Sequence, residues 1–228
     1  MLALFAGIVE DVITSDPIVA VDMHMANLFF AFRTALLTRI FTWITLLGSS
    51  QVIVGFLAVV VALLALWRKN ASITALLIAV AGSESFTQLG KLAFHRPRPE
   101  LAMYVEHSFS FPSGHATIAV AFYGFAGYLL MRIVSGWKGK THVFFATLLV
   151  IAAIGFSRLY LGVHYISDVW SGYLVGAMWL IIAISFSEWR EHLAVGEERR
   201  LPVAWAFPAS LGLVGVALAS YVGFSMRY

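Results

Sequence analysis

The sequence predicts an all-α protein, a polytopic bundle of about six membrane-spanning helices with one N-terminal amphipathic helix in the membrane interface. Hydrophobic residues make up 61% of the 228 residues and charged residues only 12%, whereas soluble domains carry about 25% charged residues. The mean hydropathy is +0.87. Much of the surface must therefore face something other than water.

A helix needs about 20 mainly apolar residues to cross the hydrocarbon of a bilayer. Six runs come close to this length, and each is expected to form a span. They are residues 51–67, 72–94, 113–131, 143–160, 164–186 and 202–222. The last run begins at Pro202, and proline suits the first turn of a helix because its missing N–H is not needed there.

The first fifty residues fit this scheme less simply. Residues 1–13 are apolar but short, and we expect them to form only part of a span. Residues 27–47 contain Arg33 and Arg39, and an arginine at bilayer depth costs at least about 2.5 kcal/mol. We therefore expect residues 27–47 to lie in the interface as one helix with aromatic side chains in the lipid. A disordered leader is the alternative.

The chain accordingly divides into three parts. Residues 1–50 hold the partial span and the interfacial helix, residues 51–187 form a core bundle, and residues 188–228 form a charged loop and an extra span. The short first segment and the extra last span suggest fusion to, or association with, other membrane modules.

Basic residues gather at one set of predicted span ends. They are Arg68, Lys69, Arg132, Lys138, Lys140, Arg190, Arg199 and Arg200. The positive-inside rule makes this face cytoplasmic. We expect a multi-pass protein of the bacterial inner (plasma) membrane whose opposite face meets the periplasm or the exterior.

Composition also excludes several kinds of site. Cysteine is absent, which excludes disulfides, thiolate metal sites and cysteine nucleophiles. The net charge is only +3, and no basic run interleaved with aromatic residues indicates a nucleic-acid partner.

Three polar clusters lie at the non-cytoplasmic ends of consecutive predicted spans. The first contains Lys91 and Arg98, the second is Pro-Ser-Gly-His at 112–115, and the third contains Arg158, His164 and Asp168. Because consecutive spans alternate in direction, we expect all three clusters on one side of the membrane at similar depth.

The first group of these residues indicates a phosphate site. Lys91, Arg98 and Arg158 supply three cations, and the planar guanidinium group matches phosphate oxygens two at a time. Ser113 and Gly114 open a predicted helix, where backbone N–H groups and the positive end of the helix dipole can face an anion. Glycine also lets the backbone approach closely.

The remaining residues can supply nucleophilic and acid–base chemistry. His164 and Asp168 are four residues apart, so the carboxylate can hold one ring nitrogen and leave the other free to attack. His115 can protonate a leaving oxygen. No cluster of metal ligands accompanies them, and we expect neither a metal nor another cofactor. His95 and Arg96 are further candidates for contact with a substrate headgroup.

In order and spacing the clusters resemble the type 2 phosphatidic acid phosphatase superfamily. The matching pattern is lysine, six residues and Arg-Pro; then Pro-Ser-Gly-His; then Ser-Arg, five residues, histidine, three residues and aspartate. All defining positions match, and the resemblance covers roughly residues 51–187.

The resemblance implies a role for each residue. It makes His164 the nucleophile that forms a phosphohistidine, Asp168 its orienting acid, and His115 the group that protonates the leaving oxygen and then activates water. Lys91, Arg98, Arg158, Ser113 and Gly114 would bind the phosphoryl oxygens.

The resemblance also implies a metal-independent membrane enzyme, a phosphoric monoester or diphosphate hydrolase acting on a lipid phosphate or lipid pyrophosphate. Candidate substrates are undecaprenyl pyrophosphate, phosphatidylglycerol phosphate, phosphatidic acid and a lipid A phosphate. One alternative is a phosphotransferase that passes the phosphoryl group to another lipid. Haloperoxidase chemistry and a non-enzymatic role in binding or transporting anionic lipid are less favoured.

Overall fold

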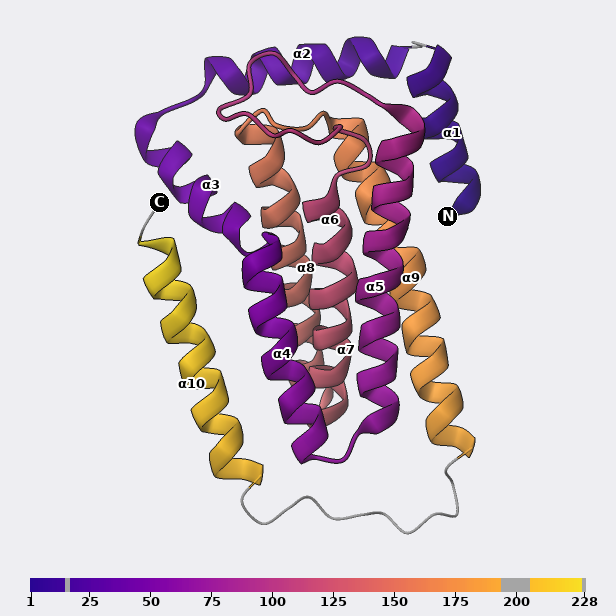
Figure 1. The fold of residues 1–228 in the computed structure, drawn as a ribbon, viewed down its shortest axis with the longest axis vertical. Coiled ribbons are helices and arrows are strands. Elements are labelled where there is room, and N and C mark those ends of the chain that lie inside the picture. Colours follow the sequence, from indigo (N-terminus) through magenta and orange to yellow (C-terminus); the bar gives the residue numbers. More distant parts are fainter. Residues whose placement is uncertain (15–16, 194–205, 227–228) are drawn as a thin grey trace.

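The computed structural model describes residues 1–14, 17–193 and 206–226. Its regular elements within these ranges are all helical, as expected. The main bundle contains α4 (Ser50–Leu66), α5 (Asn70–Phe94), α8 (Trp137–Tyr160), α9 (Ile166–Leu193) and one composite helix (Figure 1). That composite helix joins α6 (Gly114–Ile118), the π-helical turn η1 (Ala119–Tyr123) and α7 (Gly124–Ile133) without a break.

Within the described ranges, four helices are long and apolar enough to cross a membrane, and they match the predicted spans at 72–94, 113–131, 143–160 and 164–186. A fifth is added if α3 (Ala35–Leu46) and α4, bent by 44°, form one span. The predicted total of six is not confirmed. Although α10 (Ala206–Ser225) packs beside α4, its described apolar stretch Gly212–Ser225 is short, and Pro202 lies outside the described residues.

The single interfacial helix predicted over residues 27–47 is wrong in its bounds. The segment belongs to two helices, α2 (Pro17–Ala31) and α3. Thr34 ends the break by capping α3, since its hydroxyl accepts a hydrogen bond from the Leu37 N–H at 3.3 Å. Arg33 lies in the break, where it donates to the backbone carbonyls of Tyr160 and Leu101. These two hydrogen bonds hold the Arg33 guanidinium group at the end of α8 and at the α5–α6 connection, away from the apolar middle of the helices.

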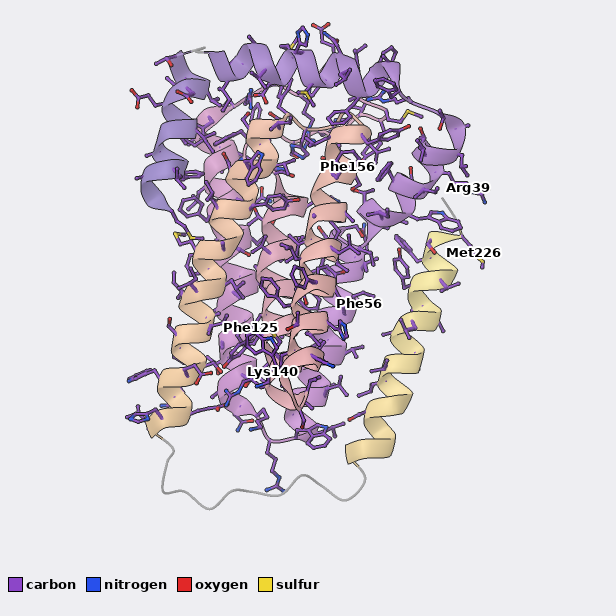
Figure 2. All side chains as sticks on the ribbon, turned by 180° about the vertical axis from the view of Figure 1, so that it is seen from behind. Arg39, Phe56, Phe125, Lys140, Phe156 and Met226 are labelled. Atoms are coloured by element: carbon purple, nitrogen blue, oxygen red, sulfur yellow. The ribbon has the colours of Figure 1, made fainter. Side chains whose placement is uncertain are left out.

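The helix ends that carry the predicted site residues lie together at one end of the bundle. There α5 ends, α6 begins, α8 ends and α9 begins, and α2 runs across them (Figure 1). α1 (Leu2–Thr14) runs from the N-terminus toward α2, beside α5 and α9 (Figure 1). The opposite end carries the basic α7–α8 connection, near which Lys140 lies (Figure 2). Which end faces the cytoplasm stays a prediction.

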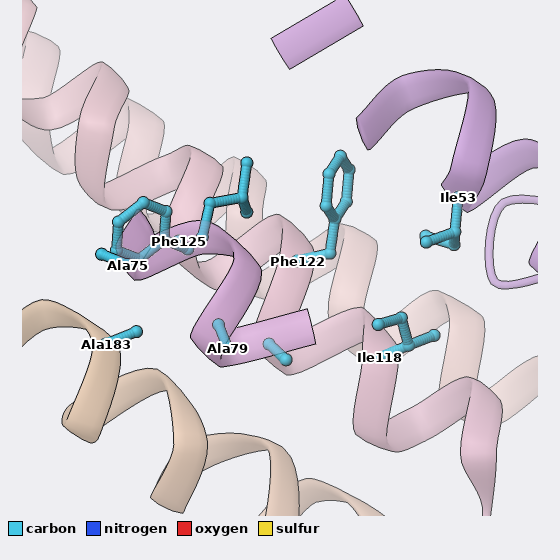
Figure 3. Packing of buried hydrophobic residues seen from close by; sticks show 9 residues of the cluster. Ile53, Ala75, Ala79, Ile118, Phe122, Phe125 and Ala183 are labelled. Atoms are coloured by element: carbon cyan, nitrogen blue, oxygen red, sulfur yellow. The ribbon is translucent and has the colours of Figure 1, made fainter. Parts of the chain in front are cut away.

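An apolar core fills the half of the bundle away from α2. Phe122 of η1 and Phe125 of α7 are almost fully buried there. They pack against small and branched side chains from α4, α5 and α9, among them Ile53, Ala79 and Ala183 (Figure 3). This cluster brings together helices that lie far apart in the sequence.

Two glycines allow α9 to approach α6 closely. A Cβ atom at Gly172 would lie 2.6 Å from the backbone oxygen of Ser113, and one at Gly176 would lie 2.5 Å from that of Thr117. Such small residues at this spacing are typical of close helix contacts in membranes. The Ser113 N–H also donates to the backbone oxygen of Asp168 at 3.0 Å. The start of α6 is thereby fixed against the start of α9.

Candidate active site

The polar end of the bundle holds a histidine–carboxylate pair. His164 lies in the α8–α9 connection and Asp168 in the first turn of α9. The His164 Nδ1 atom is 3.3 Å from Oδ2 of Asp168, which also accepts the Tyr165 N–H at 2.8 Å. Both side chains are buried. The predicted contact is therefore present, but the two residues do not share a helical face as their spacing predicts, because His164 precedes α9.

Arg98 contacts the other ring nitrogen of this histidine. Its Nη1 lies 3.2 Å from Nε2 of His164 and donates to the backbone oxygen of Val163 at 2.8 Å. Because a guanidinium group can only donate, Nε2 must accept, and the ring proton belongs on Nδ1 facing Asp168. The lone pair of Nε2 therefore faces the cationic side of the site.

The surroundings keep this imidazole neutral. His164 precedes the spanning helix α9, and burial together with Arg158 and Arg98 holds its pKa well below the ordinary value. Burial disfavours the charged ring and the two cations repel it. A neutral imidazole has an unprotonated ring nitrogen, which is the form that can act as a nucleophile.

The other two predicted cations lie in the same site. Arg158, at the end of α8, is fully buried and donates to the hydroxyls of Thr45 at 2.9 Å and Tyr104 at 2.5 Å. Lys91, in the last turn of α5, donates to the Ser108 hydroxyl at 3.0 Å. Lys91 and Arg98, from the end of α5 and the connection after it, are thus brought together with Arg158 from the end of α8.

The start of α6 supplies the rest of the predicted set. The buried Ser113 hydroxyl has no hydrogen-bond partner within the described part of the chain. Its backbone N–H is engaged with Asp168, so Ser113 can offer an anion its side chain rather than its N–H. A Cβ atom at Gly114 would make only an ordinary contact with Thr87, at 3.6 Å. Packing within the protein therefore does not require glycine at this position.

His115 lies within electrostatic reach of His164 and of all three cations. Gly48, between α3 and α4, lies against its ring, since a Cβ atom there would be 2.9 Å from Cδ2 of His115. The α3–α4 bend therefore forms one wall of the site.

Sequence reasoning missed the ion pairs behind Asp168. Arg96, expected as a headgroup contact, is instead buried, with Nη1 2.6 Å from Oδ1 of Asp168 and Nη2 2.7 Å from Oδ2 of Asp22. Asp22 comes from α2 and also accepts the backbone N–H of Ser167, 145 residues along the chain. No spacing in the sequence could have indicated such a contact.

A second missed residue is Glu106, in the connection between α5 and α6. Its carboxylate pairs with both Arg98 and Arg158. Among the residues that the structure describes, no group of three or more His, Cys, Asp or Glu side chains is arranged to hold a metal ion. Independence from metal stays a prediction.

Comparison with known proteins assigns the family. Residues 72–192, which include Lys91, His115 and Asp168, match the PAP2 superfamily. The chain belongs to the PAP2 superfamily. The protein is therefore a membrane lipid phosphate phosphatase.

Individual PAP2 relatives cover most of the chain. Phosphatidylglycerophosphatase B of Bacillus subtilis (strain 168) is 29% identical over 189 residues, covering 82% of this chain and 93% of its own. The crystal structure of a transmembrane PAP2-type phosphatidylglycerolphosphate phosphatase from Bacillus subtilis aligns with a TM-score of 0.75 at 26% identity, covering 82% of this chain and 95% of its own. The Aquifex aeolicus LpxE structure aligns at 0.59 and 26% identity, covering 72% of this chain and 95% of its own.

Proposed function

We propose that this enzyme removes the terminal phosphate of phosphatidylglycerophosphate or a closely similar lipid phosphate monoester, through a phosphohistidine at His164 and without a metal. The observation that carries the proposal is the arrangement around this ring. Asp168 lies at Nδ1 and Arg98 at Nε2, which leaves an unprotonated nitrogen facing the cations that would hold a phosphoryl group.

In the first step, Nε2 of His164 attacks phosphorus and the bond from phosphorus to the lipid oxygen breaks. His115 donates a proton to the departing oxygen, which leaves as the lipid alcohol. Arg98, Arg158 and Lys91 neutralise the charge on the phosphoryl oxygens, the task that metal ions perform in other phosphoryl transfers. Asp168 stabilises the positive charge that develops on the imidazole ring.

In the second step, water attacks the phosphorus of the phosphohistidine and the bond to Nε2 breaks. His115, now neutral, takes a proton from the water, and inorganic phosphate leaves. His115 is then protonated again and His164 is neutral, so both groups are ready for another turnover. No oxidant, reductant or further cofactor is needed.

The choice of substrate is supported by two relatives. Both the Bacillus subtilis sequence relative and the solved structure with the TM-score of 0.75 are named as phosphatidylglycerophosphate phosphatases. Undecaprenyl pyrophosphate, phosphatidic acid and a lipid A phosphate are the competing substrates. We further propose that the site faces the periplasm or the exterior, since the predicted basic loops lie at the other end of the bundle.

The test is a phosphate-release panel with purified protein in detergent, run with EDTA over these four lipids. We expect phosphatidylglycerophosphate to give the highest kcat/KM and EDTA to have no effect. Loss of activity in EDTA would refute the metal-free mechanism, and a preference for another lipid would refute the substrate.

The nucleophile is tested by His164→Ala in the same assay. Removing a catalytic nucleophile should lower kcat by at least about a thousandfold, with the folded state retained. The matched control is His142→Ala, which removes an exposed histidine near the other end of the bundle and should leave kcat unchanged. Near-normal turnover by His164→Ala would overturn the assignment.

A further inference from the structure

One short segment contacts Lys91, Arg98 and Arg158, the three cations proposed to bind the phosphoryl oxygens. Residues 104–108 belong to the connection between α5 and α6. The Tyr104 hydroxyl accepts a hydrogen bond from Arg158, the Glu106 carboxylate pairs with Arg98 and Arg158, and the Ser108 hydroxyl accepts from Lys91 and Arg98. The segment therefore covers the groups that are proposed to bind the phosphoryl oxygens.

The Glu106 carboxylate is placed as a phosphoryl group would be. Its Oε2 lies 2.6 Å from Nη2 of Arg98, and its Oε1 pairs with Nη2 of Arg158. Two oxygens on one centre thus meet two guanidinium groups, the arrangement that arginine makes with phosphate oxygens. The same Arg98 contacts Nε2 of His164, so the carboxylate lies beside the nucleophile.

A substrate phosphate and this carboxylate cannot share these donors. Although burial favours its neutral form, Arg158 and Arg98 hold the pKa of Glu106 below the ordinary value, so the group is an anion at neutral pH. A phosphoryl dianion at the same guanidinium groups would meet a like charge at contact distance. One of the two anions has to leave.

The exposure of the side chains indicates that Glu106, rather than Arg158, is the partner that can move. The Glu106 side chain is 25% exposed, whereas the Arg158 side chain is fully buried. Glu106 can therefore turn toward solvent with its loop, while Arg158 stays in place through its bond to Thr45 of α3.

We propose that Glu106 is an internal competitor for the phosphoryl subsite, a carboxylate that closes the empty site and that the phosphoryl group of the substrate must displace. The proposal rests on the proposed function, because it assumes that Arg98 and Arg158 bind the phosphoryl oxygens. Its consequence is selectivity, since a small free anion gains only the arginine contacts whereas a lipid phosphate also gains contacts with the rest of its headgroup and chains.

A purely structural role for Glu106 predicts the opposite behaviour. If the carboxylate only held the two guanidinium groups in position, its removal would leave them misplaced, and anions would bind more weakly. Anion affinity therefore separates the two roles without relying on turnover.

The decisive variant is Glu106→Gln, which removes the charge and keeps the side-chain size. We would measure binding of vanadate and inorganic phosphate by calorimetry, and the inhibition constants of both against a lipid phosphate. We expect both anions to bind about tenfold more tightly than to the unaltered protein, a difference of about 1.4 kcal/mol. The control is Glu100→Gln, an exposed acid on the same connection, which should change neither constant. Unchanged or weaker binding in Glu106→Gln would overturn the proposal.

A second variant keeps the test decisive if Glu106→Gln does not fold. Glu106→Asp retains the charge but is one methylene shorter, so its carboxylate reaches only one guanidinium group, and we expect anions to bind about threefold more tightly. Binding equal to or weaker than that of the unaltered enzyme would again refute internal competition. If the unaltered enzyme hydrolyses lipid phosphate while the Glu106→Gln constants stay unchanged, only the competitor proposal fails. If it neither binds vanadate nor releases phosphate, the proposed function fails too.

Discussion

The two ends of the bundle are held together by different kinds of interaction. At the end covered by α2, several buried side chains are charged and reach across the fold, as Arg96 does with Asp22 and Asp168. In the opposite half, the buried side chains are mainly apolar, with Phe122 and Phe125 packed among small residues (Figure 3).

This difference separates stability from positioning. Apolar packing stabilises whatever arrangement fills space well. Buried ion pairs lose most of their attraction to desolvation, so they add little net stability but are costly to break, and they fix where each group lies. We therefore expect changes in the apolar half to affect folding alone, and changes at the charged end to affect catalysis as well.

The largest combined loss of stability and activity should come from Arg96→Ala. Two carboxylates, Asp22 and Asp168, would remain buried without their shared cation, which costs about 3–5 kcal/mol in the free energy of unfolding. The displaced Asp168 would misalign His164, and kcat should fall about a hundredfold. Chemical denaturation in detergent and phosphate release measure the two effects. Arg39→Ala, an exposed arginine of α3 (Figure 2), is the control, and normal kcat in Arg96→Ala would contradict the positioning role.

Phe125→Ala tests the other half of the comparison. Removing this fully buried ring leaves a cavity and should lower the free energy of unfolding by about 3–5 kcal/mol. The folded fraction should keep its kcat/KM within about twofold, because none of the described residues that form this cluster belongs to the proposed site. Phe145→Ala, with a ring 60% exposed, should leave stability nearly unchanged. A large loss of kcat at full folding would show that the two ends are not separable.

The smallest effect concerns pH. Burial, Arg158 and Arg98 lower the pKa of His164 below 6.5, the ordinary value for histidine. The ring therefore stays neutral at pH values where a free histidine is protonated, and on the acid side activity falls as the pH drops through the lowered pKa. We expect the acid limb of kcat/KM to have its midpoint below pH 6.5. A midpoint at or above that value would mean that burial and the neighbouring arginines do not lower the pKa of His164.

Much of this arrangement could be predicted from local sequence. Long apolar runs indicate helices that cross a membrane, and the alternation of consecutive helices predicts that Lys91, His115 and His164 meet at one end. The four-residue spacing from His164 to Asp168 likewise favours their contact, although His164 precedes α9 and only Asp168 lies in its first turn.

Other features depend on contacts between distant parts of the chain. Asp22 and Glu106 carry no motif, and their partners are set only when α2 and the α5–α6 connection fold over the site. The helix break near Thr34 has a local cause, the preference of threonine for a helix N-cap, which the energetic cost of Arg33 and Arg39 in the bilayer does not indicate. The predicted sixth span rested on apolar composition alone, which does not fix how far a helix extends.

Gly48 has a consequence for how this chain can change over evolution. The missing side chain at the α3–α4 bend leaves space for the ring of His115 and for Ile154. A larger residue at position 48 would push first on the group proposed to carry the leaving-group proton. Substitutions at 48 and 154 should therefore be accepted only in compensating pairs. Covariation of these two positions among related sequences would show that the shape of the bend is constrained by the position of His115.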